Sequence, residues 1–356
     1  MTVKGRDLTP KRFITLTVML MLAIVVGVCV LPHSRHLRFA SLQEPTVVKL
    51  GWLYERIHDD PTPIDIIFIG SSHTVFGVDS AEVERRARLL IGQDVHVVNF
   101  AVQHLGRDVP WLLAREAIEA RNVKLLVVEV TEDESRALHP AFASLADPSD
   151  LIDAPLLINP SYFSELAELP SRQISLFLRT MLPGAFDAAP GFNPIQYRGA
   201  HWDDTWAQEG SIVAPIHPVV PRITSPSATK MENERVHWAR LTSNKLSLPS
   251  SLSWLEWRAN LQYIDRIVAL ARRHGVALRV LYLPSYHSAT HPTQVAVYEK
   301  LGLMWYPPPE LLADRLLWND VNHLNYYGSL VLASWLAKCI AKEHIPGAQL
   351  AWHSFQ

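Results

Sequence analysis

An uncharged stretch of 19 residues, from Phe13 to Leu31, restricts this chain more than any other feature of its sequence. About 20 consecutive apolar residues are needed for a helix to cross the roughly 30 Å of hydrocarbon in a bilayer. The stretch therefore predicts a transmembrane anchor over residues 13–31, with the membrane bilayer as a partner. A cleaved signal peptide is the alternative, although its apolar region is usually only about 7–15 residues long.

The basic residues around this stretch indicate its orientation. Four of them lie within residues 1–12, whereas only Arg35 and Arg38 follow shortly after the stretch. Because cytoplasmic flanks carry the excess of Lys and Arg, residues 1–12 are expected in the cytoplasm and the remainder outside it. The sequence thus predicts a single-pass protein of the inner (cytoplasmic) membrane, with an extracytoplasmic, periplasmic domain.

Strands and helices alternate in the region after the anchor. An apolar run at 64–69, typical of a strand buried on both faces, precedes a helical pattern that Asp79 opens and Gly92 ends. The other expected elements are strands at 95–100, 125–130 and 276–283 and helices that begin near 108, 252 and 326. This order predicts an α/β fold of three layers, in which helices cover both faces of a parallel sheet.

The periodicity is lost from about 135 to 250, where Pro, Trp and His are frequent. We expect residues 135–250 to be a long insertion that serves as a lid or a glycan-binding region, since aromatic rings offer flat faces for sugars. The alternative is that its Trp residues only pack the insertion onto the domain. Residues 61–134 and 251–345 then form the α/β domain, and residues 32–60 connect it to the anchor.

Three polar residues at the ends of expected elements could form a nucleophilic site. Ser72 follows the first buried strand, at the edge of a parallel sheet where ligands bind, with Ser71 as the alternative nucleophile. Asp320 and His323 lie three residues apart before the last helix, so the carboxylate can reach the ring Nδ1 while Nε2 faces outward. Such a histidine can take the proton of a serine hydroxyl. The alternative is that these residues only form turns and helix caps.

Two motifs resemble those of the SGNH (GDSL-like) hydrolases. Gly70-Ser71-Ser72 resembles their first block, with Ser71 at the position usually held by Asp, and the D-x-x-H of residues 320–323 resembles their last block. The resemblance implies an SGNH-like domain with Ser72 as nucleophile and His323, oriented by Asp320, as base.

With the anchor and the insertion, these motifs look most like the membrane-anchored members of that superfamily. Those members act in teichoic-acid D-alanylation (the DltD type) and in O-acetylation of exported polysaccharides such as alginate. The resemblance implies an O-acyltransferase or esterase that acts on an exported or cell-envelope glycan, beside a membrane-bound O-acyltransferase. The alternative is a non-catalytic SGNH-like scaffold that binds the glycan or that acyltransferase.

The middle motifs of the superfamily are altered in this chain. Ala101 stands where the oxyanion-hole Gly would fall, and the third strand leads to Thr131 with no Asn nearby. The candidate oxyanion donors are therefore Ala101, Asn99, Gln103 and Thr131. Because one missing donor costs about 2.7–4 kcal/mol of transition-state stabilisation, the altered motifs also favour the scaffold alternative.

Composition excludes several other classes of protein. The formal net charge is -2 and no basic run with interleaved aromatics follows the first dozen residues, so nucleic acid is not expected as a partner. Cys29 and Cys339 lie in different settings, which excludes a disulfide framework. His201 and the acidic residues after it lack the spacing of a metal-ligand pair. We expect neither a metal nor a cofactor.

Overall fold

The computed structural model describes residues 9–42, 44, 46–132, 138–156, 159–202, 225–243, 249–255, 258–292 and 294–343. A five-stranded parallel sheet lies at its centre, in the order β2-β1-β3-β4-β5. The strands are β1 (Ile66–Ile69), β2 (Val97–Asn99), β3 (Leu125–Val130), β4 (Ala277–Tyr282) and β5 (Leu303–Trp305). The expected α/β fold with a parallel sheet is confirmed. The short strand β5 was not indicated by the sequence pattern.

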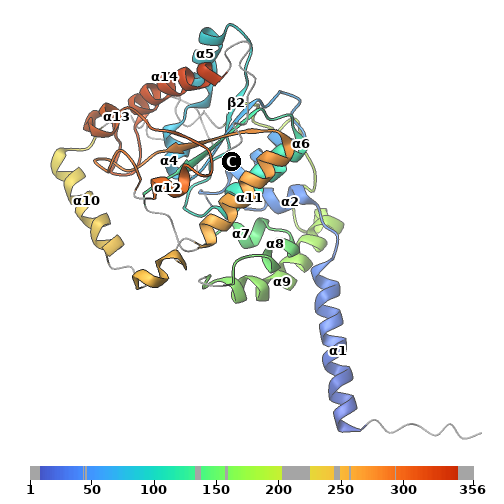
Figure 1. Ribbon diagram of the computed structural model, residues 1–356. Coiled ribbons are helices and arrows are strands. Elements are labelled where there is room, and N and C mark those ends of the chain that lie inside the picture. The colour runs from blue at the N-terminus through green and yellow to red at the C-terminus, as the bar shows by residue number, and fades with distance from the viewer. Residues whose placement is uncertain are drawn as a thin grey trace, which may run out of the picture.

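Helices cover both faces of the sheet (Figure 1). One face packs against α5 (Ser80–Ile91) and α14 (Tyr326–Glu343), and the other against α6 (Asp108–Ala120) and α11 (Arg258–His274). Two separate hydrophobic layers result, because both faces of every central strand are buried.

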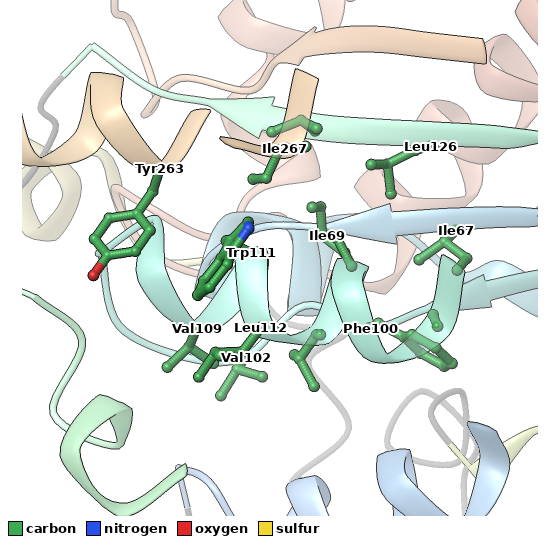
Figure 2. Packing of buried hydrophobic residues seen from close by; sticks show 14 of the residues in the cluster. Ile67, Ile69, Phe100, Val102, Val109, Trp111, Leu112, Leu126, Tyr263 and Ile267 are labelled. Atoms are coloured by element: carbon green, nitrogen blue, oxygen red, sulfur yellow. The ribbon is translucent and has the colours of Figure 1, made fainter. Parts of the chain in front are cut away.

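The alternation along β1 shows how the two layers are divided. Successive strand residues point to opposite faces, so Ile66 and Phe68 join one apolar cluster while Ile67 and Ile69 join the other. Figure 2 shows the second cluster, in which side chains of α6 and α11, among them Trp111, lie against the sheet. All four β1 side chains are fully buried, which fixes the strand from which the Ser72 turn leaves.

The ends of α5 follow from local chemistry. The Asp79 side chain accepts a hydrogen bond from the Glu82 backbone N–H at 2.9 Å, and this satisfies one of the free donors of the first turn. Gly92 ends the helix with φ of 72°, a left-handed conformation that glycine adopts without steric cost. Both ends match the expected helix.

The segment expected to be a connector, 32–60, belongs instead to the core of the domain. It forms α2 (Arg35–Ala40) and α3 (Lys49–His58), and its apolar side chains, including Leu50 and Leu53, are buried with those of α6. An ion pair of 2.5 Å between Arg38 and Asp147 ties α2 to the segment after β3. These two helices, of 6 and 10 residues, were missed because both are too short to show a sustained helical period.

The described parts of 135–250 are largely helical. The elements are α7 (Phe142–Leu145), α8 (Pro148–Ile152), α9 (Tyr162–Met181), η1 (Pro183–Ala185), α10 (Ala228–Ser243) and, at its edge, η3 (Ser250–Leu255). The expectation of a segment without helical pattern is wrong for the 20-residue α9, which continues through Pro170, a residue that usually ends or kinks a helix. Trp202 packs edge-on against Trp52 of α3 with ring centroids 5.6 Å apart, so this Trp joins its segment to the domain.

The apolar N-terminal stretch forms α1 (Pro10–Cys29), a single helix of 20 residues with a mean hydropathy of 2.3 and none of it buried. It is long and apolar enough to span a membrane, and only its last turn approaches the domain (Figure 1). The remaining short helices are α4 (Ser72–Gly77), α12 (Val295–Tyr298), α13 (Pro309–Ala313) and η4 (Arg315–Leu317).

Candidate active site

Ser72 is the first residue of α4, directly beyond the carboxyl end of β1. Gly70 carries the chain out of the strand, and Ser71 precedes the helix in an extended conformation with its side chain accepting from the His73 N–H at 3.3 Å. The Ser71 hydroxyl is buried and donates to Glu129 Oε1 at 2.7 Å. The partly exposed Ser72 hydroxyl is therefore the one placed to react.

Asp320 and His323 lie in the turn before α14, with their side chains in direct contact. The Asp320 carboxylate accepts backbone hydrogen bonds of 2.9 Å from the N–H groups of Asn322 and His323. It also lies 2.9 and 3.0 Å from His323 Nδ1, through Oδ1 and Oδ2. With Nδ1–H donating to this carboxylate, Nε2 is left as a hydrogen-bond acceptor.

His323 Nε2 lies 2.9 Å from Ser72 Oγ, across 251 residues of sequence. The distance from Ser72 Oγ to His323 Nε2 and the distance from His323 Nδ1 to Asp320 both fall within the roughly 2.6–3.2 Å that proton transfer between side chains requires. The Phe76 ring meets the His323 ring edge-on at 5.0 Å and helps to hold its orientation. The structure thus brings together the three residues that the sequence predicted as nucleophile, base and orienting group.

The surroundings of Asp320 favour its ionised form. Burial alone raises the pKa of this carboxyl. The hydrogen bond from His323 and its charge outweigh burial, together with the hydrogen bonds from the Asn322 backbone and the Asn319 side chain, and lower the pKa to about 2. The carboxylate therefore stays charged at neutral pH, where it can stabilise an imidazolium on His323.

The turn that carries His323 is fixed by the start of α14. Asn325 is fully buried, and its side chain accepts from the Gly328 N–H at 3.0 Å and donates to the Leu316 carbonyl at 2.7 Å. At Gly328 a Cβ atom would lie 2.1 Å from the Leu317 carbonyl oxygen, so only glycine lets α14 approach η4 this closely.

Glu129 is the residue of the site that sequence reasoning missed. This fully buried β3 side chain accepts hydrogen bonds from the Ser71 and Thr74 N–H groups at 3.0 and 2.9 Å and from both of their hydroxyls. A Cβ atom on Gly70 would lie 2.5 Å from Glu129 Oε2, so glycine is required there too. The signal in the sequence was a lone acidic residue inside the apolar run of β3.

His73 lies beside the base but has a different environment. Its Nδ1 is buried without a hydrogen-bond partner in the described part of the chain, and its ring centroid is 5.8 Å from that of His323. Burial lowers the pKa of His73, the Glu129 carboxylate partly offsets this effect, and His323 lowers the pKa further. A neutral His73 avoids placing a second positive charge beside the base.

Two of the four predicted oxyanion donors are engaged elsewhere. The Asn99 side-chain amide donates to the carbonyls of Thr74 and Val78 at 2.9 and 2.8 Å, and its oxygen accepts the Ala101 N–H at 3.0 Å. This geometry argues against both as oxyanion donors, because the Asn99 amide holds α4 against β2 and the Ala101 N–H bonds within its own segment. The sequence could not reveal these tertiary partners.

The other two candidates retain free donors. At Gln103 only the backbone carbonyl is engaged, by His139 Nε2 at 2.6 Å, and its side-chain amide bonds to no described residue. The Thr131 hydroxyl is buried at the end of β3 with no partner among the described residues. Within the same residues the Ser72 N–H also makes no hydrogen bond. These three free donors follow the carboxyl ends of β1, β2 and β3, the edge of the sheet at which Ser72 lies.

No protein-family model matches this chain, and a search of curated proteins finds no match either. Among the described residues, no three His, Cys, Asp or Glu side chains are grouped so that they could hold a metal ion. The geometry of Ser72, His323 and Asp320 is therefore what supports a function for this chain.

Replacing Glu129 by Gln should destabilise the turn that carries Ser72. The amide would present an NH2 group to donors that now point at the carboxylate, and leaving a buried donor unsatisfied costs about 1–3 kcal/mol. We expect the midpoint of urea unfolding to fall, whereas Glu119→Gln on the exposed end of α6 should leave it unchanged. Equal midpoints for Glu129→Gln and the wild type would contradict the role assigned to this carboxylate.

The lowered pKa of Asp320 makes its contribution to stability depend on pH. A carboxyl with a pKa of about 2 when folded, below its ordinary value of 3.8, stabilises the folded state above about pH 4 and loses this effect as the pH falls toward 2. The difference in unfolding free energy between the wild type and Asp320→Asn should therefore shrink between pH 5 and pH 3. Urea titrations of both proteins measure it, and a constant difference would refute the assigned ionisation.

Proposed function

We propose that this protein is a serine-dependent acyl-transfer enzyme, an esterase or O-acyltransferase of SGNH type. The observation that carries the proposal is the 2.9 Å contact between Ser72 Oγ and His323 Nε2, with Nδ1 of the same ring held by Asp320. A hydroxyl, a neutral imidazole and an orienting carboxylate in this order are what nucleophilic catalysis by serine requires.

In the proposed first step, Ser72 Oγ attacks the carbonyl carbon of an acyl ester while its proton passes to His323 Nε2. In this proposal the charge on the carbonyl oxygen is held by the Ser72 N–H, Gln103 and Thr131, which are free donors beyond the carboxyl ends of β1, β2 and β3. Collapse of this intermediate breaks the ester bond, and the leaving alkoxide takes the proton back from His323. The acyl group remains on Ser72.

In the second step, His323 removes a proton from a sugar hydroxyl or from water, and the resulting oxygen attacks the acyl carbonyl of the acyl-enzyme. The bond between the acyl group and Ser72 Oγ then breaks, and Oγ takes the proton back from His323. Transfer to the sugar makes the protein an O-acyltransferase, and transfer to water makes it an esterase. We propose an exported or cell-envelope glycan as the acceptor and a membrane-bound O-acyltransferase as the supplier of acyl groups, on the resemblance of the two sequence motifs and the anchor.

We place the protein in the inner membrane through α1, with the α/β domain on the extracytoplasmic side. Support comes from the length and hydropathy of α1, from the absence of buried residues in it, and from the basic residues that precede it. The second candidate is a scaffold that binds the glycan or the acyltransferase without catalysis, and the engagement of Asn99 and Ala101 by other partners favours it.

Turnover of a small chromogenic acyl ester by the full chain in detergent separates the two candidates. We expect Ser72→Ala to lower the rate at least about a thousandfold, as removal of a serine nucleophile does, and Asp320→Asn to lower it by about four orders of magnitude because the imidazole is held in the wrong tautomer. Ser175→Ala on the exposed side of α9 is the matched control and should keep full activity.

The same variants should be tested in cells for acylation of the envelope glycan. Loss of acylation with Ser72→Ala but not with Ser175→Ala is the expected result. Absence of ester turnover in the folded wild type, together with normal acylation in Ser72→Ala cells, would establish the scaffold instead.

A further inference from the structure

The helix α9 presents a long apolar face that no described part of the chain covers. Phe163, Ile174 and Met181 lie on this outward face with 72%, 42% and 52% of their surfaces exposed. Their spacing of 11 and 7 residues returns to the same side of an α-helix. We call this surface the outer face of α9.

The side of α9 next to the outer face is packed onto the domain. Leu169 and Leu176 are buried there, and Gln173 between them is buried as well. The apolar surface of the helix is therefore wider than the part that faces the core. Large exposed apolar surfaces on such a helix mark a site of interaction with a membrane or a protein.

The position of α9 relative to α1 favours a membrane over a protein as the partner of this surface. Gln173 Nε2 donates to the Cys29 carbonyl at the end of α1 at 2.8 Å, and the Ser34 N–H donates to Thr180 Oγ1 at 3.0 Å. Figure 1 shows α8 and α9 at the end of the domain nearest to α1. A helix of 20 residues is about 30 Å long, so the end of α1 that meets α9 is the end at the bilayer surface.

The charges of α9 also fit an interfacial helix. Glu165, Glu168, Arg172 and Arg179 balance one another, and their positions in the sequence place them away from the outer face. Beyond α9, Leu182 and Phe186 continue the exposed apolar surface. Contact with lipid through this surface would depend on apolar burial and not on anionic headgroups.

We propose that the outer face of α9 lies in the extracytoplasmic leaflet of the membrane that α1 spans, with the helix parallel to the bilayer. This inference rests on the membrane anchoring proposed above and is independent of the chemistry at Ser72. A domain held by both α1 and α9 has a fixed orientation to the bilayer, whereas one held by α1 alone could turn about its link.

The fixed orientation also bears on the candidate active site. α9 packs against α7, and His139 just before α7 bonds to the Gln103 carbonyl at the edge of the site. The site is thus connected through packed elements to the surface that would contact lipid. Such an arrangement suits an acyl donor that is delivered at the membrane.

Fluorescent probes on single cysteines test this inference in the full chain. In a background with Cys29→Ser and Cys339→Ser, Phe163→Cys and Ile174→Cys would carry a polarity-sensitive fluorophore in phosphatidylcholine vesicles with quenchers on the acyl chains near the headgroups. We expect quenching several times stronger than for a probe at Leu89→Cys, an exposed leucine on α5. High salt should leave this quenching unchanged.

A probe at Leu20→Cys in the middle of α1 distinguishes failure of the α9 inference from failure of the membrane anchor. If the Leu20 probe is in lipid while those at Phe163 and Ile174 are as accessible to water as the one at Leu89, the α9 inference is overturned and the anchor stands. If the Leu20 probe is also in water, both fail. Shielding of the α9 probes only in native membranes, and not in pure lipid, would assign the surface to a protein partner and overturn the inference.

Discussion

The Glu129 carboxylate, fully buried at the end of β3, accepts hydrogen bonds from the backbone N–H groups and the hydroxyls of both Ser71 and Thr74. A charge in such a place costs several kcal/mol unless it is well bonded, and each hydrogen bond to a charged group returns about 1.5–3 kcal/mol. The four donors that converge on the carboxylate therefore offset the cost of its burial. Their convergence ties the conformation of the Ser72 turn to the central strand and demands glycine at position 70.

His323 reaches Ser72 from the other end of the chain by a similar combination of polar bonds and close packing. Asn325 holds the first turn of α14 and the Leu316 carbonyl together, and Gly328 lets the helix approach η4. α14 in turn packs on α5, which follows the Ser72 helix, so both halves of the site rest on one layer of the domain. The 2.9 Å contact between Ser72 and His323 is the result of that layer.

Local patterns were enough to predict the elements that hold the site and the three residues at its centre. The limits of α5 followed from Asp79 and Gly92, and β3 from a run of apolar residues, because each depends on neighbours in the sequence. The hydrogen bonds by which Asn99 holds α4 against β2 could not be predicted, since the accepting carbonyls of Thr74 and Val78 are distant in sequence. α9 was missed because Pro170 lies inside it, and proline usually marks the end of a helix.

The central claim is that Ser72 is a nucleophile activated by His323. It is tested most directly by mass spectrometry of the full chain after exposure to a serine-reactive fluorophosphonate, with the labelled residue mapped by proteolysis. We expect addition of one phosphonyl group at Ser72 in the wild type and none in a folded His323→Ala variant. A folded wild type that takes up no label, or equal labelling of the wild type and His323→Ala, would contradict activation of Ser72 by His323.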